Sequence, residues 1–312
     1  MTKLNLVDGR KIFDSNVVAG YSHYQVPVSI VLRDRVRVYY AARNKFNCSE
    51  TFFVDFDLGL SEVVGHANKP VLELGVKGSF DENGIMPDCA ISKGEEIWLY
   101  YSGWSAHPLY PHANKIGLAV STDGGVTFSK IGSGPVMGLE THDPFSVSSG
   151  FVTETSAGFK MYYSSGIKWE KSEGIWNVNH DIKVASSRDG IYWDRDFKTL
   201  IPLAPNESHA RPVIWTQGEK QYLFFCSRQL SSFRDGPGSY GIRFVSRGVE
   251  ETTWGAPEDP NWTCQLNSKH DCWDSKMRAY PYPLVTPEQN FLLFNGNSFG
   301  VTGFGVAEIM TE

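Results

Sequence analysis

The sequence predicts an all-β fold, a five-bladed β-propeller with four-stranded antiparallel blades around a central axis. First, a short aromatic run ending in small or polar residues, IWLYYSGW at residues 97–104, occurs in varied form five times. Second, the second aromatic of each copy falls at residues 40, 101, 163, 225 and 294, at intervals of 61, 62, 62 and 69. Such a period indicates a repeating structural unit. Third, β-branched and aromatic residues are abundant, and helical periodicity is almost absent.

Each aromatic run is predicted to be the second strand of a hairpin. A strand-like segment precedes each run by 13 or 14 residues, and a polar turn separates the two. The first strands are predicted at residues 26–31, 87–91, 149–152, 212–215 and 281–285. Third strands are predicted at 51–57, 116–121, 181–186, 240–246 and 302–309, and a fourth is clearest at 69–74. Residues 4–13, within a segment of about 1–15, are predicted to complete the last blade.

Two turns that follow third strands carry a Ser-x-Asp-Gly pattern, STDGGVTF at residues 121–128 and SRDGIYW at 187–193. In such a turn Gly takes the positive φ, the Asp or Ser side chain bonds backbone amides, and the last aromatic packs between strands. We interpret Asp123 and Asp189 as structural rather than catalytic, because these turns lie at the rim between outer strands.

Bulk properties fit one globular domain over residues 1–312. The chain is 41% hydrophobic and 21% charged, which allows a large core. Length alone would suggest about two domains, but the repeat spans the whole chain. The net charge is −6 with both signs interspersed, so nothing points to a nucleic acid or a membrane as partner. No apolar run approaches the roughly 20 residues that span a bilayer.

The N-terminus and the cysteines predict a cytoplasmic protein. Residues 1–20 lack a basic segment followed by an apolar stretch, so no signal peptide is expected. The five cysteines, at 48, 89, 226, 264 and 272, are odd in number and scattered, which fits reduced thiols. Nothing in the sequence indicates an oligomeric state.

The chemistry is predicted to lie at one mouth of the propeller, where inner strands begin and second strands end. Polar clusters at the same position in every blade indicate a site, because buried polar groups need partners that a ligand can supply. Candidate binding residues on or before the inner strands are His23, Gln25, Asp88, His142, His209, Arg211, Asp274 and Tyr280. Those at the ends of second strands are Arg43, Trp104, Arg228, Asn295 and Asn297.

These residue types suit a carbohydrate ligand. Amides and Arg bind hydroxyl groups with good geometry, and Trp faces can stack on sugar C–H surfaces. Glycosidic chemistry needs an acid and a base or nucleophile flanking the bond. We assign Glu207 as general acid, with Asp81 or Asp143 activating water or stabilising an oxocarbenium-like transition state. The Arg and His residues also indicate an anionic group on the ligand, and no cofactor is expected.

Every candidate has a structural alternative. Asp81 could cap a turn, Asp143 could be a turn residue before a proline, Asp88 could hydrogen bond across the channel, Asp274 could cap a loop, and Glu207 could pair with Arg211. The histidines at 23, 142 and 209 could form an axial metal site, but their spacing matches no local metal motif, so no metal is predicted. Neither a nucleophile elbow nor a phosphate-binding glycine loop is present.

At these residues the chain resembles the five-bladed propeller glycosidase superfamily, which includes glycoside hydrolase families 43, 32, 68, 62, 117 and 130. More narrowly, it is similar to uncharacterised glycosidase-like proteins encoded among bacterial surface-polysaccharide genes. The matching hallmarks are residues 78–87, 100–104, Arg211 with Pro212, Tyr280 with Pro281, and 295–297 with 303–305. The resemblance implies the propeller fold, a carbohydrate ligand and glycosidic-bond chemistry.

Departures from the family pattern keep the reaction open. Families 43 and 32 carry an Asp at the start of the first inner strand, where this chain has Gln25 between Tyr24 and Val26. Their acid Glu would be expected near Ala210, and the nearest one is Glu207. We therefore expect a carbohydrate-active enzyme that cleaves, or transfers across, a glycosidic bond. The alternatives are a non-catalytic sugar-binding propeller, and a phosphorylase or glycosyltransferase acting on an anionic or activated sugar.

Overall fold

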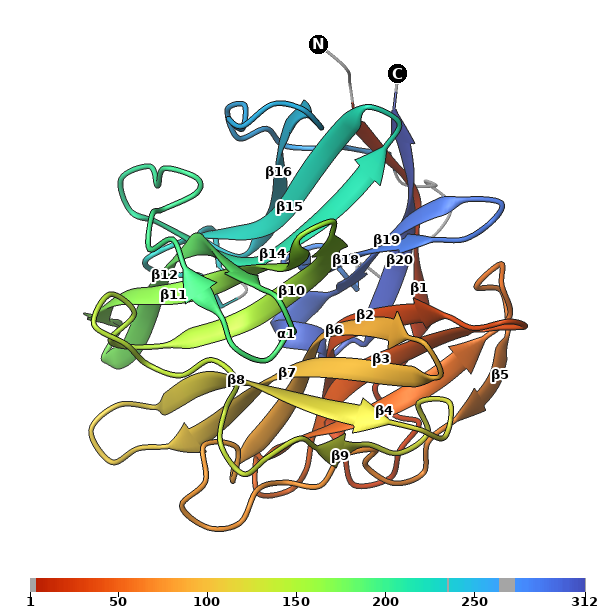
Figure 1. Ribbon diagram of the computed structural model, residues 1–312, viewed down its shortest axis with the longest axis horizontal. Coiled ribbons are helices and arrows are strands. Elements are labelled where there is room, and N and C mark those ends of the chain that lie inside the picture. The colour runs from red at the N-terminus through yellow and green to blue at the C-terminus, as the bar shows by residue number, and fades with distance from the viewer. Residues whose placement is uncertain (1–3, 235, 264–272, 312) are drawn as a thin grey trace.

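The computed structural model describes residues 4–234, 236–263 and 273–311, and the regular secondary structure of these residues is almost entirely strand. The chain forms strands β1 to β20 and one short helical segment, α1 (Asn297–Gly300), most of which are labelled in Figure 1. Of the five cysteines, Cys89 and Cys226 are buried free thiols and Cys48 is a half-buried one, whereas Cys264 and Cys272 lie outside the described residues. Within the described chain, no helix has the length and apolarity needed to cross a membrane.

The strands fall into five groups, numbered here in chain order. Group one holds β2 (Ser22–Val31), β3 (Val36–Arg43), β4 (Ser49–Phe56) and β5 (Val63–His66); group two holds β6 (Gly84–Lys93), β7 (Glu96–Ala106), β8 (His112–Ser121) and β9 (Ser129–Lys130). Group three holds β10 (Val147–Thr155), β11 (Gly158–Ser172), β12 (Ile175–Ser187) and β13 (Asp194–Arg195); group four holds β14 (Glu207–Gln217), β15 (Lys220–Gln229) and β16 (Gly241–Gly248). Group five holds β18 (Ala279–Val285), β19 (Asn290–Asn295) and β20 (Phe304–Thr311), joined by β1 (Leu4–Phe13) and β17 (Asn261–Trp262).

The five predicted hairpins and the five third strands are confirmed as antiparallel pairs. Groups one and two share a sheet only through one parallel pair, Ser49 with Gly84. The N-terminal strand β1 pairs antiparallel with β20, which places the two chain ends side by side in Figure 1.

The prediction of a fourth strand at residues 69–74 is wrong. The fourth strand of group one is β5, and the predicted segment contributes only one bridge, from Leu72 to Thr51. Pro70 lies in this segment and has no N–H to donate, which limits its pairing. Group four departs from the four-stranded pattern as well, since its sheet has three strands and an added bridge from Phe244 to Glu258.

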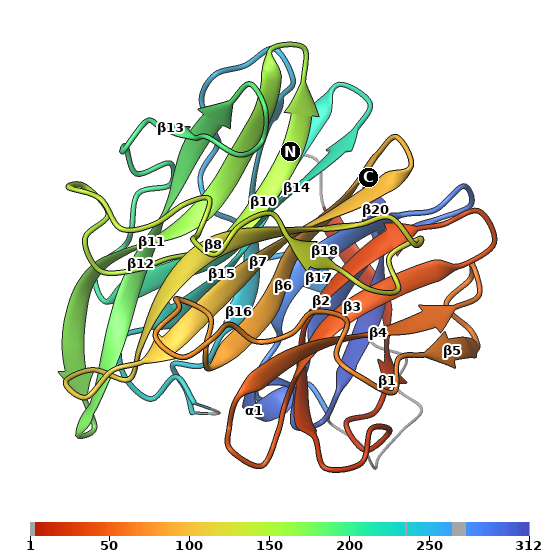
Figure 2. The ribbon, with the colours of Figure 1, turned by 60° about the horizontal axis from the view of Figure 1, so that its bottom comes forward.

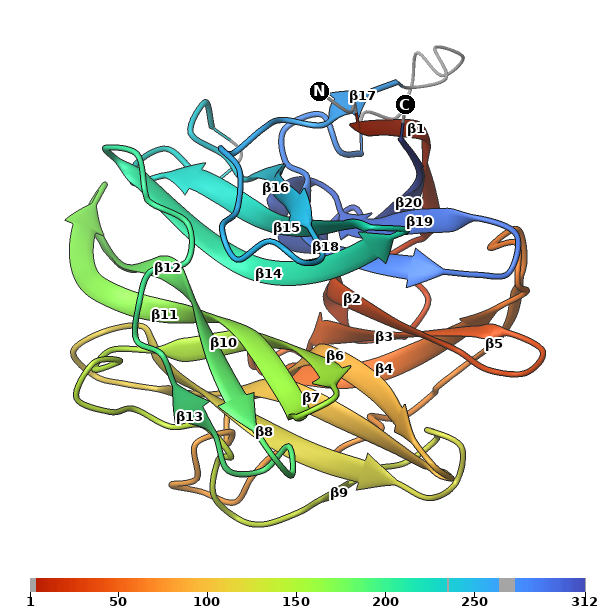
Figure 3. The ribbon, with the colours of Figure 1, turned by 45° about the horizontal axis from the view of Figure 1, so that its top comes forward.

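The inner strands β2, β6, β10, β14 and β18 contact one another in chain order, and β18 also contacts β2. They lie near the middle of the molecule, with β5, β9 and β16 towards the outside (Figure 1). Figures 2 and 3 show the same groups from two other directions. Side chains from different groups therefore meet around one central region.

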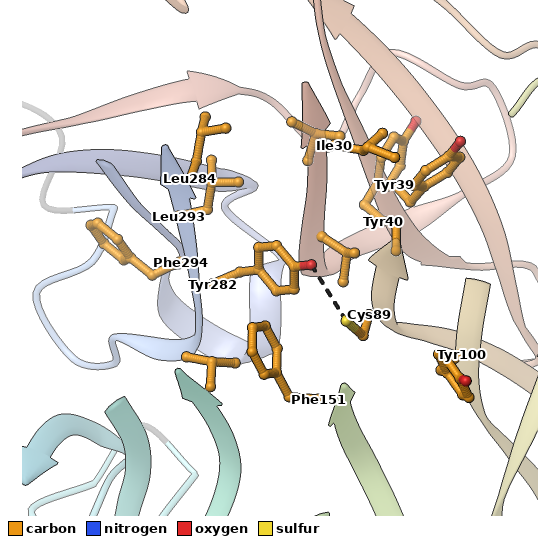
Figure 4. Close-up of a cluster of buried hydrophobic side chains, with 14 of the residues drawn as sticks. Ile30, Tyr39, Tyr40, Cys89, Tyr100, Phe151, Tyr282, Leu284, Leu293 and Phe294 are labelled. Atoms are coloured by element: carbon orange, nitrogen blue, oxygen red, sulfur yellow. Dashed lines mark hydrogen bonds between the residues drawn. The ribbon is translucent and has the colours of Figure 1, made fainter. Parts of the chain in front are cut away.

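Tyr282 of β18 lies in this central region among apolar side chains from several groups (Figure 4). Its hydroxyl contacts the Cys89 sulfur of β6 at 3.8 Å, and its ring meets Phe151 of β10 edge-on at 5.6 Å between centroids. Burial raises the pKa of Tyr282 well above its ordinary value. The centre is therefore a packed core around these side chains.

The Ser-x-Asp-Gly turns are structural, as predicted. The Asp123 carboxylate accepts bonds from the backbone amides of Val126 and Thr127, and Asp189 accepts from those of Ile191 and Tyr192. The amide bonds hold the pKa of Asp189 below its usual range.

These turns also connect neighbouring groups. Tyr39 of group one donates its hydroxyl to the Gly125 carbonyl at 2.9 Å, and Tyr100 of group two donates to the Gly190 carbonyl at 2.8 Å. In groups one and two the first tyrosine of the Tyr-Tyr pair therefore fixes the turn of the next group.

Every inner strand carries a bulge at the corresponding place. Four of the bulged residues have positive φ although none is glycine: Val26 (58°), Ser149 (57°), Arg211 (58°) and Tyr280 (58°). This backbone is strained for such residues, so other contacts must hold it.

Hydrogen bonds between consecutive groups hold these bulges. The backbone N–H of each bulged residue donates to a side chain in the preceding group. The acceptor belongs to the residue directly after the second aromatic of that group's aromatic run. The pairs are Val26 to Asn295 Oδ1 (3.3 Å), Ser149 to Ser102 Oγ (2.8 Å), Arg211 to Ser164 Oγ (3.0 Å) and Tyr280 to Cys226 Sγ (3.1 Å). In group two the bulge begins at Pro87, which has no N–H, and the matching residue of group one is Ala41, which has no acceptor. Donor and acceptor are thus both present or both missing at each junction.

Replacing Ser164 with alanine tests this arrangement. The variant leaves the buried Arg211 N–H without its partner, which should lower the free energy of unfolding by about 1–3 kcal/mol. Chemical denaturation measures the change. Ser156→Ala, at an exposed turn position, should stay within about 0.5 kcal/mol of the unmodified protein. Ala41→Ser should bring no stabilisation, because Pro87 has no N–H to donate; equal effects of Ser164→Ala and Ser156→Ala would contradict the account.

Candidate functional site

One edge of the sheets, here called the mouth edge, gathers the polar side chains. Inner strands begin there, second strands end there and third strands begin there. Two third strands are longer than predicted, since β8 begins at His112 rather than 116 and β12 at Ile175 rather than 181. The added residues carry His112, Asn177, Asn179 and His180 to this edge, and sequence analysis did not identify them as site residues.

An ion pair at the centre joins group two to group four. Arg211 Nη1 donates to Asp88 Oδ1 at 2.9 Å, and both side chains are 1% exposed. Asp88 Oδ2 accepts from Ser102 Oγ at 2.7 Å and from the Gly150 N–H at 3.2 Å. Burial raises the pKa of Asp88 to about 6, although the Arg211 charge opposes the shift. Asp88 therefore bonds across the centre, as its structural interpretation predicts, and Nε and Nη2 of Arg211 have no partner among the described residues.

Asp81 and Asp143 occupy matching places in groups two and three. Asp81 accepts from the Tyr101 hydroxyl at 3.0 Å and pairs with Lys130 of β9 at 2.6 Å. Asp143 accepts from the Tyr163 hydroxyl at 2.9 Å. Its cationic partners on outer strands are Lys183 (2.8 Å) and Arg195 (2.7 Å). Both carboxylates are buried, with side-chain exposures of 1% and 0%.

Glu207 has the corresponding contacts in group four. Ser227 of β15 donates to its carboxylate at 3.0 Å, and Arg243 of the third strand β16 pairs with it at 3.1 Å. His209 lies 3.1 Å from its other oxygen, so the predicted alternative of pairing with Arg211 is wrong. Burial would raise the pKa of Glu207, but the bonds from Ser227 and His209 outweigh it and the net shift is downward. The Glu207 side chain is 11% exposed, more than Asp81 or Asp143.

Several other candidates also have contacts within the fold. Asn295 accepts from the Val26 N–H, and Asn297 accepts from the N–H groups of Lys276 and Met277. Asp274 pairs with Arg278 at 2.7 Å. His142 is exposed and lies against Phe197, Trp104 lies over Gly84, and His209 packs on Phe225. Within the described residues, no three His, Cys, Asp or Glu side chains are placed to hold a metal ion.

Three arginines near the mouth edge bind only uncharged acceptors. Arg43 Nη2 donates to Gln25 Oε1 at 3.4 Å, and Arg234 Nη2 donates to Asn177 Oδ1 at 3.0 Å. Arg228 is 4% exposed and donates to the Tyr240 hydroxyl, to Asn179 Oδ1 and to the carbonyls of Val178 and Gln229. Among the described residues none of the three has a carboxylate within 4.0 Å, unlike Arg37, Arg195, Arg211 and Arg243.

The charges of these arginines help to lower the pKa values of the histidines at this edge. Burial, with the charges of Arg234 and Arg43, lowers the pKa of His112 to about 4. Burial, with the charges of Arg228 and His112, lowers the pKa of His180 to about 3, and His180 Nε2 has no partner among the described residues. Burial and Arg43 lower the pKa of His23 as well. Both His112 and His180 are therefore neutral near pH 7.

An aromatic cluster adjoins His112. The Tyr110 ring stacks on His107 at 3.9 Å between centroids and lies 5.2 Å from Trp169 of β11. Trp169 meets His112 edge-on at 5.8 Å. Tyr110, His112 and Trp169 are all half-buried, so part of each ring remains accessible.

Two cavities lie beside this edge. One of about 500 Å³ is lined by His23 and Ser22 of β2 together with Lys11, Asp14, Ser15, Asn16, Trp273, Val301 and Thr302. The other, of about 370 Å³, is lined by Tyr240, Asp274 and neighbouring residues. Neither is lined by Arg43, Arg234 or His112.

Comparisons with known proteins give one family and one fold. No protein-family model matches the chain. "Uncharacterized protein Rv1502" of Mycobacterium tuberculosis is 30% identical over 293 residues, 92% of each chain, and "Uncharacterized protein MT1551" of another strain gives the same values.

Solved structures show the fold. A structure titled "Glycoside hydrolase" aligns with a TM-score of 0.70 at 16% identity, over 99% of this chain and 92% of the other. A thermostable family-43 glycoside hydrolase gives 0.62 at 15% identity, over 96% and 92%. The GH32 β-fructofuranosidase BmSUC1 of Bombyx mori gives 0.61 at 12% identity, over 93% and 64%. The fold is therefore the β-propeller of glycoside hydrolases related to families 43 and 32.

The lowered pKa values of His112 and His180 predict acid sensitivity. In the unfolded chain each histidine has its ordinary pKa of 6.5, and in the folded protein its pKa is lower. Each histidine therefore binds a proton more tightly in the unfolded chain. Their contribution to stability is complete above pH 6.5 and is lost as the pH falls towards 4 and 3. We expect a loss on the order of 1–2 kcal/mol per histidine between pH 6.5 and 5. His112→Gln and His180→Gln should each flatten the pH dependence of the unfolding free energy in this window; an unchanged slope would contradict the assignment.

Proposed function

Because the chain belongs to the same family as Uncharacterized protein Rv1502 of Mycobacterium tuberculosis and shares the propeller fold of glycoside hydrolases, we propose that it is a carbohydrate-active protein that cleaves, or transfers across, a glycosidic bond at its mouth edge. The observation that carries the proposal is the aromatic surface of Tyr110 and Trp169 beside a polar edge. Aromatic faces accept the C–H surfaces of sugars, and the amides and guanidinium groups there match hydroxyl groups.

The proposed architecture is one five-bladed propeller over residues 1–312, in which each strand group is a blade. The contact of β18 with β2 supports a closed ring of inner strands. The pairing of β1 with β20 supports closure of the last blade by the N-terminal segment. In this arrangement the mouth edge faces one end of the axis, and the first residues of all inner strands converge there.

Of the carboxylates predicted to be catalytic, Glu207 is the one we retain at the reacting bond. Asp81 and Asp143 are buried and neutralised by Lys130, Lys183 and Arg195, which supports a structural role inside their blades. Glu207 is partly exposed and begins an inner strand. Its lowered pKa keeps it ionised near pH 7, so we propose that it acts as a base or stabilises positive charge on the sugar rather than donating a proton.

A second function, non-catalytic sugar binding, is favoured by the repeat itself. Glu207 makes the same kinds of contact as Asp143, a hydroxyl from the second strand and a cation from an outer strand. Asp88 is held by Arg211 at the centre. Hydrolysis requires two carboxylates flanking the bond, and of the three predicted here Asp81 and Asp143 are neutralised by cations.

Glu207→Gln separates the two functions. For an enzyme, turnover of a responsive oligosaccharide should fall by about 100-fold or more, while saccharide affinity changes little. Asp143→Asn is the matched control, because it removes the corresponding charge one blade away. The measurements are turnover over an oligosaccharide panel, saccharide binding by calorimetry, and melting temperature.

Each outcome is decisive. Loss of turnover in Glu207→Gln but not in Asp143→Asn, at similar melting temperatures, supports catalysis by Glu207. Binding without turnover in the unmodified protein supports the second function. Trp169→Ala should weaken saccharide binding under both functions, and absence of any saccharide binding by the unmodified protein would contradict both.

A further inference from the structure

We infer that the mouth edge binds its saccharide through an oxyanion on the sugar, a carboxylate or a phosphate, held by Arg43 and Arg234 with Arg228 behind them. This inference rests on the proposed carbohydrate function and names the substrate class. Of these residues, Arg234 was not among the residues predicted from the sequence, because it lies in the loop after β15 rather than on a strand.

The arginines of this edge differ from other buried arginines in the partners they bind. Elsewhere in the fold a buried guanidinium meets a carboxylate, as Arg37 does with Asp55 at 2.7 Å and Arg211 with Asp88 at 2.9 Å. Arg228 is just as buried but bonds only carbonyl, amide and phenol oxygens. A buried charge without an opposite charge is costly, so an anion nearby would relieve this cost.

The positions of the three arginines also support this site. Arg43 ends the second strand of group one, Arg228 lies near the end of β15 in group four, and Arg234 follows in the next loop. Arg234 and Arg228 both donate to the first half of β12, at Asn177 (3.0 Å) and Asn179 (3.4 Å). In the same stretch Val178 pairs with Trp169. The charge of Arg234 also contributes to the lowered pKa of Arg43 and of His112. Among the described residues, no carboxylate contributes to the pKa shifts of Arg43, His112 or His180.

The functional groups at this edge suit an oxyanion carried by a sugar. A guanidinium offers a planar fork of donors that matches the two oxygens of a carboxylate or phosphate, and such charge-assisted bonds are strong. The neutral imidazoles of His112 and His180 add hydrogen-bonding groups next to this fork. The rings of Tyr110 and Trp169 lie beside His112, where the sugar that carries the oxyanion would stack.

Four probes test the inference: glucose, glucuronate, glucose 1-phosphate and inorganic phosphate. Binding is measured by calorimetry and by the rise in melting temperature, which a ligand of the folded state must cause. We expect at least one of the two anionic sugars to bind at least tenfold more tightly than glucose. In the double variant Arg43→Gln with Arg234→Gln this preference should be lost.

Arg188→Gln is the matched control, since Arg188 is an exposed arginine in the Ser-x-Asp-Gly turn of group three. It should retain the preference within twofold. Arg43→Lys keeps the charge and should recover part of the affinity. Should the double variant fail to fold, the salt dependence of the unmodified protein replaces it, because affinity for an anionic sugar must fall with added NaCl while affinity for glucose does not.

The outcomes separate this inference from the proposed function. Equal binding of glucose and both anionic sugars, unaffected by the arginine changes, overturns the inference and leaves the carbohydrate function standing. Inorganic phosphate that binds as tightly as glucose 1-phosphate, with no binding of any sugar lacking phosphate, supports the cationic site and contradicts the carbohydrate function. Absence of binding by every anion at millimolar concentration overturns the inference. Glucuronate and glucose 1-phosphate distinguish a carboxylate ligand from a phosphate one.

Discussion

The structure depends on the hydrogen bonds that tie each inner-strand bulge to the preceding strand group. A bulge with positive φ at Val26, Ser149, Arg211 or Tyr280 is strained backbone, and it persists because its N–H has a fixed acceptor in the neighbouring group. The junction between groups one and two is the exception, because Pro87 has no N–H to donate there and Ala41 has no side-chain acceptor. The joint absence of donor and acceptor is consistent with this constraint. The constraint therefore sets both the spacing of the groups and the direction of the side chains nearest the centre.

Function follows from where these bulges lie. They re-aim Arg211 and Tyr280 at the start of inner strands, and Arg211 then reaches Asp88 in another group. This ion pair is buried, although Nε and Nη2 of Arg211 have no partner among the described residues. Arg43 and Arg234 lie further out. The carboxylates are divided in the same way, since Asp81 and Asp143 neutralise cations within their own groups. The result is an edge with neutral histidines, aromatic rings and arginines that have no carboxylate partner among the described residues.

Much of the fold could be predicted from the sequence, because the Tyr-Tyr period marks one buried hairpin per group and apolar patterning reports burial directly. The fourth strand of group one, at residues 63–66 rather than 69–74, could not be predicted, because the bonding of an edge strand leaves little trace in apolar patterning. His112 and His180 were missed for a related reason. Their strands continue past the apolar residues through backbone pairing alone, so the pattern ended too early. The partners of Asp81 and Asp143 were hidden because Lys130 and Arg195 lie 49 and 52 residues further along the chain.

The central claim is that an oxyanion on a sugar binds at the mouth edge, between strand groups one and four and beside the aromatic rings of Tyr110 in group two and Trp169 in group three. A crystal structure of the protein soaked with glucose 1-phosphate tests this most directly. The account predicts phosphate oxygens within hydrogen-bond distance of the Arg43 and Arg234 guanidinium groups, with the sugar ring against Trp169 or Tyr110. A phosphate bound at the opposite edge, or on the outer strands beside Lys130 or Lys183, would contradict it.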